Sequence, residues 1–199
     1  LFWRMRELID NGSLGSLQSV TSHSSSVAQW GLTHAADMLL YLAQDAEIEF
    51  VQGHITCNES DFDDNRLDTD PPINMGYVQF KNGIRGYVLT GSGYEFEVSG
   101  SEGRLRTIND TGTLSFRKFM GEHRLLAEMP AVIYAHESGT INAMRDIVKA
   151  LDTDGDTLGN LTLACRSQEM IIGFVESHRQ NGARVKLPLE NRELYVGTW

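Results

Sequence analysis

A histidine and an aspartate stand three residues apart at the start of an apolar stretch. The stretch is WGLTHAADMLLYL, residues 30–42, and the pair is His34 and Asp37. On a helix this spacing places both side chains on one face. Histidine titrates near neutral pH and is the commonest general acid or base, and a carboxylate one turn away can fix its tautomer and orientation. The same spacing also suits a structural pair in which Asp37 serves a cap or a salt bridge.

Trp30 comes just before this helix and also has two interpretations. Its indole offers a large apolar surface and one N–H donor, so it is either a core anchor or the wall of a ligand pocket. Spacing does not separate the two.

The other charged candidates lie in a polar loop, residues 58–72. Loops of this length inside a compact domain are usually lids, binding loops or disordered segments. Arg66 and Asp68 are candidates to point into a site beneath the loop. The acidic residues of the loop are of the type that binds hard cations, although a solvated surface explains them better. They are Asp61, Asp63, Asp64, Asp68 and Asp70.

Several common motifs are absent or incomplete. No G-x-G-x-x-G follows a predicted strand, and the sequence has no Walker A or G-x-S-x-G motif. The stretch DTDGDTLGN fails as an EF-hand, because Thr157 and Leu163 stand where the loop needs glycine and glutamate. His54 and Cys57 are expected on opposite faces of one strand, which is poor for chelation. The sequence therefore predicts no metal site.

Hydrophobic periodicity predicts the elements that position these residues. Helices are expected over 2–10, 31–43, 140–151 and 160–182. Strands are expected over 16–26 and 47–57, followed by two hairpins and a further strand between 74 and 119, with Asn82 and Gly83 at the first hairpin tip. This order predicts one α+β domain over 1–199: an open, largely antiparallel sheet with helices packed on one face.

Composition narrows the functional classes. The chain has 199 residues, of which 41% are hydrophobic and 22% charged, as is usual for globular proteins. The net charge of −10 argues against nucleic acid or an anionic membrane as the main partner. No apolar run is long enough for a membrane span, and no signal peptide is recognisable. Cys57 and Cys165 are expected to be reduced, buried thiols of a cytoplasmic protein, with one disulfide as the alternative.

The first residues read as the inside of a helix. LFWRMRELIDNG begins at Leu1 with neither an initiator Met nor an N-cap. We therefore expect this chain to be a piece of a longer protein.

Four phrases resemble the C-terminal domain of the glucose–fructose oxidoreductase, inositol dehydrogenase and MocA family (Gfo/Idh/MocA). They are MRELIDNGSLGSLQSV, WGLTHAADMLLYL, VSGSEGRLR and NGARVKLPLE, in the family's order. THAADML resembles the family's H-x-x-D helix, and VSGSEGRLR resembles its G-T-E-G-x-L hairpin with Ser101 in place of threonine. The resemblance covers nearly the whole chain.

The resemblance implies a fold, a cofactor and partners. The fold is the open sheet seen in the C-terminal domains of dihydrodipicolinate reductase and glyceraldehyde-3-phosphate dehydrogenase. A preceding Rossmann domain, which this chain lacks, binds NAD or NADP in the full-length parent. The chain alone is expected to bind no cofactor and to be inactive. The implied partners are a sugar, cyclitol or related polyol as substrate and a second subunit on the sheet face, giving a homo-oligomer.

The same resemblance assigns roles to residues, with one departure. His34 matches the family's catalytic histidine, which handles the proton of the substrate hydroxyl, and Asp37 matches the aspartate after it. Trp30 stands where dehydrogenases of the family carry a further aspartate, and an indole is no base. We assign Trp30, Asp37, Arg66 and Asp68 to substrate binding.

Three functions remain open on the sequence. The first is the substrate-binding and oligomerisation domain of an NAD(P)-dependent oxidoreductase. The second is a stand-alone, non-catalytic dimerisation or binding module. The third is a redox-neutral relative, a lyase, isomerase or glycosidase that borrows NAD, with which the loss of the aspartate at Trp30 is equally compatible.

Overall fold

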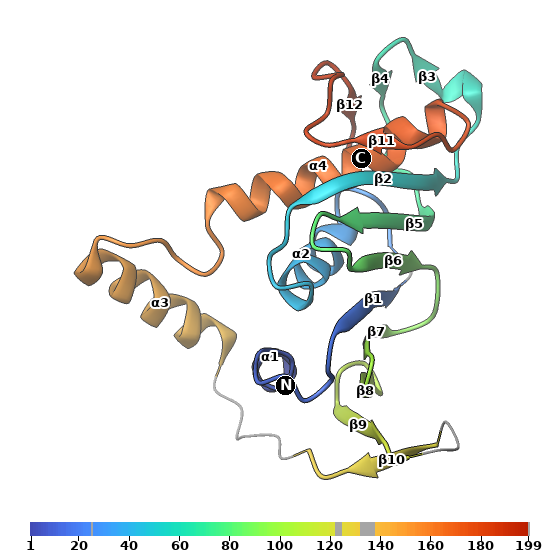
Figure 1. The fold of residues 1–199 in the computed structure, drawn as a ribbon. Helices are drawn as coiled ribbons and strands as arrows, with labels where there is room; N and C mark the ends of the chain where they lie inside the picture. The colour runs from blue at the N-terminus through green and yellow to red at the C-terminus, as the bar shows by residue number, and fades with distance from the viewer. Residues whose placement is uncertain (25, 122–124, 132–137, 199) are drawn as a thin grey trace.

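Strands from both halves of the chain join into one nine-stranded sheet (Figure 1). The computed structural model describes residues 1–24, 26–121, 125–131 and 138–198. The strand order is β10-β9-β8-β7-β1-β6-β5-β2-β11. In chain order the bounds are β1 Leu17–Ser24, β2 Ile48–Ile55, β5 Ile73–Phe80, β6 Arg85–Leu89, β7 Tyr94–Gly100, β8 Gly103–Ile108, β9 Thr113–Phe119, β10 Leu126–Met129 and β11 Val185–Lys186.

The pairing in this sheet is antiparallel except at its centre. There β1 runs parallel to β6, with Thr21 opposite Tyr87, and antiparallel to β7, with Thr21 opposite Glu97. The parallel pair requires a long crossover, and α2 (Leu32–Leu42) lies within it. The predicted α+β architecture is confirmed, and so are the two predicted hairpins, β5–β6 and β7–β8.

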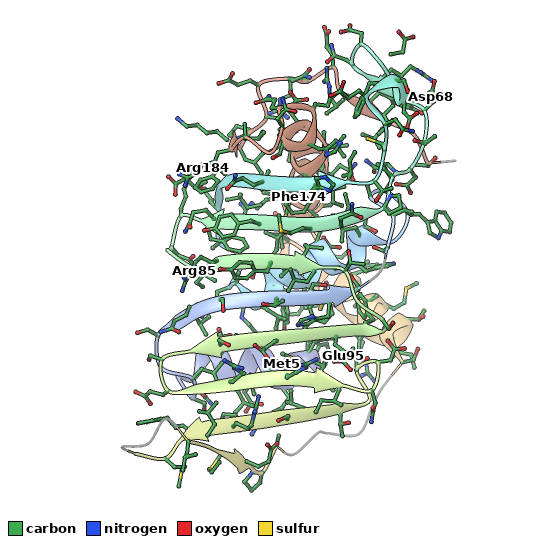
Figure 2. All side chains as sticks on the ribbon, turned by 90° about the vertical axis from the view of Figure 1, so that its right-hand side faces the viewer. Met5, Asp68, Arg85, Glu95, Phe174 and Arg184 are labelled. Atoms are coloured by element: carbon green, nitrogen blue, oxygen red, sulfur yellow. The ribbon has the colours of Figure 1, made fainter. Side chains whose placement is uncertain are left out.

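Side chains alternate between a buried and an open face of the sheet. On β5, Val78 and Phe80 are fully buried, whereas Tyr77 and Gln79 between them are half-buried. Figure 2 looks onto this open sheet face, which carries Arg85 and Glu95. Residues of this face include Thr21, Phe50, Tyr77, Tyr87, Glu97 and Arg106.

Three helices cover the other face (Figure 1). They are α1 (Phe2–Asp10), α2 and α4 (Leu161–Arg179). Helix α4 packs closely on β2 at Gly53, where a Cβ would lie 2.4 Å from the Cβ of Phe174. Gly76 of β5 faces the ring of the same phenylalanine. Glycines on two neighbouring strands therefore make the hollow into which Phe174 packs.

Helix α3 (Gly139–Thr153) projects away from this layer (Figure 1). It joins the loop that leads into α4, where Leu158 N donates to Asp146 Oδ2 at 2.7 Å. No described helix is long and apolar enough to cross a membrane.

The predicted loop 58–72 contains regular structure. It forms η1 (Glu59–Asp61), β3 (Phe62–Asp63) and β4 (Arg66–Leu67), and β4 pairs with β12 (Tyr195–Val196) in a separate three-stranded sheet. Two-residue strands carry too little alternation to be recognised in sequence. The loop is therefore anchored at its centre by the C-terminal tail.

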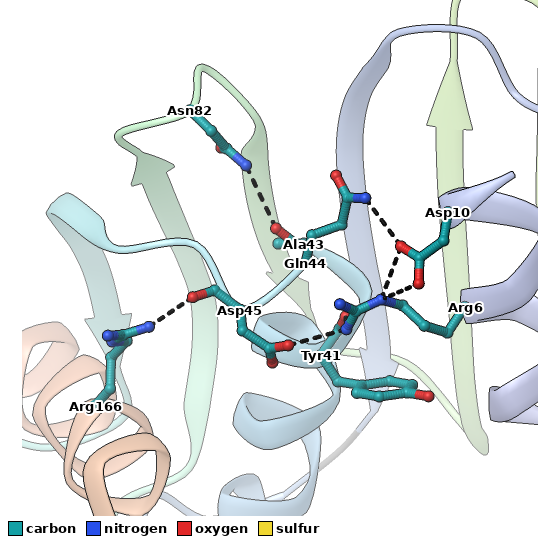
Figure 3. Close-up of polar contacts among 8 residues, drawn as sticks. All are labelled: Arg6, Asp10, Tyr41, Ala43, Gln44, Asp45, Asn82 and Arg166. Carbon is teal, nitrogen blue, oxygen red and sulfur yellow. Dashed lines mark hydrogen bonds and ion pairs between the residues drawn. The ribbon is translucent and has the colours of Figure 1, made fainter. Parts of the chain in front are cut away.

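An arginine on α1 holds the end of α2 in place (Figure 3). Arg6 Nη1 donates to Asp45 Oδ2 at 2.9 Å and to the carbonyl of Tyr41 at 2.8 Å, while its Nε pairs with Asp10. From the other side, Arg166 of α4 donates to the carbonyl of Asp45 at 2.6 Å. This network fixes three helices to one another at the C-terminal end of α2.

Candidate functional site

A tight turn presents the start of α2. Gly31 N and Leu32 N both donate to the carbonyl of Val27, at 3.3 and 3.0 Å. Gly31 lies against Ser26, where a Cβ would come within 2.6 Å of the serine Cβ, so a larger residue would displace the turn. This close approach sets where the first turn of α2 begins.

Asp70 ties the long loop to this turn. Its carboxylate accepts hydrogen bonds from Gln29 N at 2.7 Å and from Trp30 N at 2.9 Å. Asp70 is one of the loop aspartates whose residue type suits a hard cation. The structure gives it a different role, because its two oxygens hold the backbone just before the helix.

The turn places the predicted site residues on the surface. The Trp30 side chain is 73% exposed, and His34 and Asp37 are exposed on successive turns of α2. Ser167 Oγ of α4 donates to Asp37 Oδ1. Asp37 thus links two helices through one carboxylate oxygen, which is one of the structural roles that its spacing allowed. Its other carboxylate oxygen takes no part in that hydrogen bond.

A cavity of about 400 Å³ opens beside Asp37, and we call it the site cavity. Its walls are mostly apolar or aromatic, and Asp37 and Asp45 are its charged groups. The described residues that line it are Phe2, Trp3, Asp37, Met38, Leu40, Tyr41, Asp45, Leu158, Gly159, Asn160, Leu163 and Ala164. An aromatic wall beside a carboxylate acceptor suits a polyhydroxylated ring, which has apolar faces and hydroxyl edges.

The pKa of Tyr94, at the start of β7, is shifted by its burial and by the charge of Asp37. Burial, together with the nearby Asp37 carboxylate, raises the pKa of Tyr94 to about 12. The phenol is therefore protonated at neutral pH and retains a donor O–H. Its ring packs edge-on against Phe96, which in turn packs edge-on against Phe2 of the site cavity.

Arg66 and Asp68 form a pair with each other. Their side chains make an ion pair of 2.7 Å, and both are exposed. The Arg66 guanidinium also lies 4.5 Å from the ring centroid of Tyr195. Figure 2 shows Asp68 beyond the end of the large sheet, by the three-stranded sheet, whereas His34 and Asp37 are on α2.

A second cavity, of about 800 Å³, lies at the β2 edge of the sheet, and we call it the rim cavity. His54 of β2 and His178 of α4 line it with their rings edge to face, 4.8 Å between centroids. Cys57 lines the same cavity, so the expectation that it points away from His54 is wrong: β2 ends at Ile55 and the alternation stops there.

The surroundings shift the pKa values of two groups of the rim cavity. Burial, aided by Asp61, raises the pKa of the Cys57 thiol, and thiols bind metals as thiolates. Burial and the neighbouring His54 lower the pKa of His178, against a smaller opposing effect of Glu59. Within the described ranges, no three His, Cys, Asp or Glu side chains are grouped to hold a metal ion. Neither described cysteine is in a disulfide, but the expectation of buried thiols is wrong, because Cys57 is half-buried and Cys165 is exposed.

A model of the oxidoreductase family C-terminal alpha/beta domain, Gfo/Idh/MocA, matches residues 6–187. The chain belongs to the Gfo/Idh/MocA oxidoreductase family. No curated protein sequence matches it.

Solved structures share this Gfo/Idh/MocA fold at low identity. Levoglucosan dehydrogenase in complex with NADH and L-sorbose superposes with a TM-score of 0.72 at 16% identity, covering 94% of this chain and 64% of that one. Aldose-aldose oxidoreductase from Caulobacter crescentus, complexed with glycerol, gives 0.66 at 15%, covering 94% and 60%. An oxidoreductase from Sinorhizobium meliloti gives 0.65 at 18%, covering 93% and 61%. The chain thus spans 60–64% of these relatives' lengths.

Proposed function

We propose that this chain is the substrate-side domain of an NAD(P)-dependent oxidoreductase acting on a sugar, cyclitol or related polyol. The observation that carries the proposal is the site cavity, which opens beside Asp37 one turn beyond His34 of the family's H-x-x-D helix. Relatives of the same fold include a dehydrogenase solved with NADH and L-sorbose.

The nucleotide is proposed to lie on another domain. A dinucleotide diphosphate is bound by free backbone N–H groups at a strand–turn–helix junction. The β1-to-α2 junction has that order, but the four N–H groups of its turn are taken: Gln29 and Trp30 donate to Asp70, and Gly31 and Leu32 donate to Val27. A diphosphate would have to displace these hydrogen bonds to use the turn. We propose that a Rossmann domain outside residues 1–199 holds NAD or NADP.

The nicotinamide supplies hydride exchange when bound, and residues of this chain orient the substrate. We assign His34 the proton of the hydroxyl whose carbon gives up the hydride. Asp37 accepts a second hydroxyl with the oxygen that Ser167 does not use, and Trp3 packs on an apolar ring face. Trp30 is exposed just before α2, at the position of the family's further aspartate, so His34 works without that carboxylate.

The assay uses the longer polypeptide that the proposal requires. Purified polypeptide is incubated with NAD or NADP and a panel of sugars, cyclitols and linear polyols, and reduced nicotinamide is followed by absorbance. We expect turnover with one or more panel members and none from residues 1–199 alone. Absence of turnover across the panel, with folded protein that binds nucleotide, would contradict the proposal.

A redox-neutral relative is the second candidate, and the indole at Trp30 is equally compatible with it. Such an enzyme oxidises and then re-reduces the same substrate, so product accumulates without net NADH. Rapid-mixing absorbance separates the two: steady NADH release indicates a dehydrogenase, whereas a transient that decays as product forms indicates the redox-neutral reaction. A stand-alone binding module would give neither signal.

We also propose that the open sheet face meets a second copy of the chain. It presents ring contacts between Phe50 and Tyr77 and between Tyr77 and Tyr87, with centroids 5.8 and 5.6 Å apart. Beside them lies an ion pair between Arg106 and Glu95 at 3.1 Å. An apolar centre with a charged flank is the composition of a protein interface.

A further inference from the structure

Helix α2 begins without a capping side chain of its own. Its N-cap position is Gly31, which makes no side-chain hydrogen bond to the first turn. Helices usually begin at Ser, Thr, Asp or Asn, whose side-chain oxygen accepts from the N–H groups of the first turn. The turn before α2 therefore depends on backbone acceptors and on side chains that other segments bring to it.

Asp70, near the end of the long loop, supplies two acceptors to this turn. Its Oδ1 accepts from Gln29 N at 2.7 Å, and its Oδ2 accepts from Trp30 N at 2.9 Å. The next residue continues the contact, because Ala28 N donates to the carbonyl of Pro71 at 2.9 Å. With both carboxylate oxygens engaged, Asp70 fixes the direction of two consecutive N–H groups.

Helix α4 holds the same turn from another side. Gln168 Nε2 donates to Gln29 Oε1 at 2.7 Å. The preceding residue, Ser167, donates to Asp37 on the next turn of α2. Gln29 is therefore fixed through its backbone by Asp70 and through its side chain by Gln168.

The body of α2 is held by different contacts. Its inward-facing side chains are buried in the core: Leu32, Ala35, Ala36, Leu39, Leu40 and Leu42. Removing Asp70 leaves this apolar packing in place, and it frees the turn that carries Trp30 and leads directly into His34. The role of Asp70 can therefore be separated from the folding of the helix.

We infer that Asp70 is a positioning residue for the reaction at the site cavity. It acts through the backbone of Gln29 and Trp30, and so fixes the first turn of α2, which carries His34. The inference rests on the proposed function, which assigns His34 the proton of the reacting hydroxyl. A general acid or base must lie within hydrogen-bond reach of its proton, and a displacement of about 1 Å can lower the rate by about 10²-fold.

Steady-state kinetics of the longer polypeptide test the inference. Asp70→Ala should lower kcat by about tenfold or more, because both N–H groups lose their acceptor. Asp70→Asn keeps one acceptor oxygen in a side chain of the same size, and should retain more of kcat. Asp63→Asn is the matched control, at an exposed aspartate of the same loop, and should leave kcat unchanged.

A double-variant cycle with His34 separates positioning from general destabilisation. In a His34→Ala background, Asp70→Ala should lower kcat by about twofold at most, because the side chain that it positions is gone. A merely structural role would lower kcat by the same factor in both backgrounds. If Asp70→Ala does not fold, Asp70→Asn takes its place in the cycle.

Two results would overturn the inference: an unchanged kcat in Asp70→Ala, or equal losses of kcat in the two backgrounds. Failure of the proposed function looks different. Absence of turnover by the unsubstituted polypeptide rejects the proposed function, and with it the role of Asp70 in the reaction. Turnover that Asp70→Ala leaves intact rejects this inference alone.

Discussion

His34 and Asp37 occupy successive turns of α2, but their surroundings differ. Asp37 is held by Ser167 and lines the site cavity, whereas His34 is exposed on the turn before it. The exposed position of His34 means that its removal costs little packing. Function and stability can therefore be separated at this residue by one substitution.

His34→Ala in the longer polypeptide is expected to lower kcat by about 10²-fold or more, the usual worth of a positioned acid or base. The thermal midpoint should be unchanged. His54→Ala replaces an exposed histidine of the rim cavity and should leave kcat unchanged. Steady-state kinetics of the three proteins decides the point, and equal kcat values would remove His34 from the mechanism.

The pH dependence of stability should report the environment of His178. Its folded pKa lies below 6.5 because of burial and His54, with Glu59 opposing. In acid the unfolded chain therefore binds more protons than the folded one, so this stabilisation is present above pH 6.5 and is lost as pH falls through the folded pKa.

His178→Gln should accordingly show a shallower loss of unfolding free energy between pH 7 and pH 5 than the parent chain. Urea titrations at several pH values measure this slope for both proteins. Identical slopes would show that His178 has no depressed pKa.

At the scale of single residues, the sequence indicated which side chains could act chemically but not their hydrogen-bond partners. The helix and the shared face of His34 and Asp37 follow from local spacing. Ser167 and Asp70 could not be found this way, because their hydrogen bonds span 130 and 41 positions in sequence. Arg6 with Asp10 gave a local signal, an i,i+4 pair, but its link to Asp45 depends on helix packing.

The predicted elements follow hydrophobic periodicity closely where they are long. Helix 31–43 is observed as Leu32–Leu42, and strand 47–57 as Ile48–Ile55. β3, β4, β11 and β12 span two residues each and were not predicted as strands, because their pairing depends on contacts with distant segments. The four-residue strand β10 was not predicted either. Helix α3 was predicted correctly, but nothing in its sequence told which surface its apolar side would meet.

The Phe174 hollow should be sensitive to one added methyl group. Gly53→Ala places a Cβ against Phe174 and should destabilise the chain by about 1–3 kcal/mol through overpacking. Gly139→Ala is the matched control, since nothing lies within 4 Å of its Cβ position. Urea midpoints of the two variants measure the difference, and equal midpoints would contradict the packing of α4 on β2.

At the scale of the whole molecule, the open sheet face and the helix-covered face lie on opposite sides of the sheet (Figure 1). The site cavity is lined by residues of the covering helices α1, α2 and α4. A second copy on the open sheet face therefore leaves the site cavity accessible.

Tyr87→Glu should weaken self-association, because it places a charge at the centre of the open sheet face. Sedimentation velocity is expected to show a shift toward monomer for this variant. Glu190→Lys, an exposed change in the C-terminal segment, should leave the distribution unchanged. If the unsubstituted chain is monomeric at all concentrations, the proposed homo-oligomer is contradicted.

The central claim is that a carbohydrate carbon bound at the site cavity exchanges hydride with a nicotinamide held by another domain. The most direct measurement incubates the longer polypeptide with NAD or NADP and carbon-deuterated sugars or polyols, and analyses the nucleotide by mass spectrometry. The account predicts deuterium on the reduced nicotinamide, abolished or strongly reduced by His34→Ala. Product or binding without any deuterium on the nucleotide would contradict it.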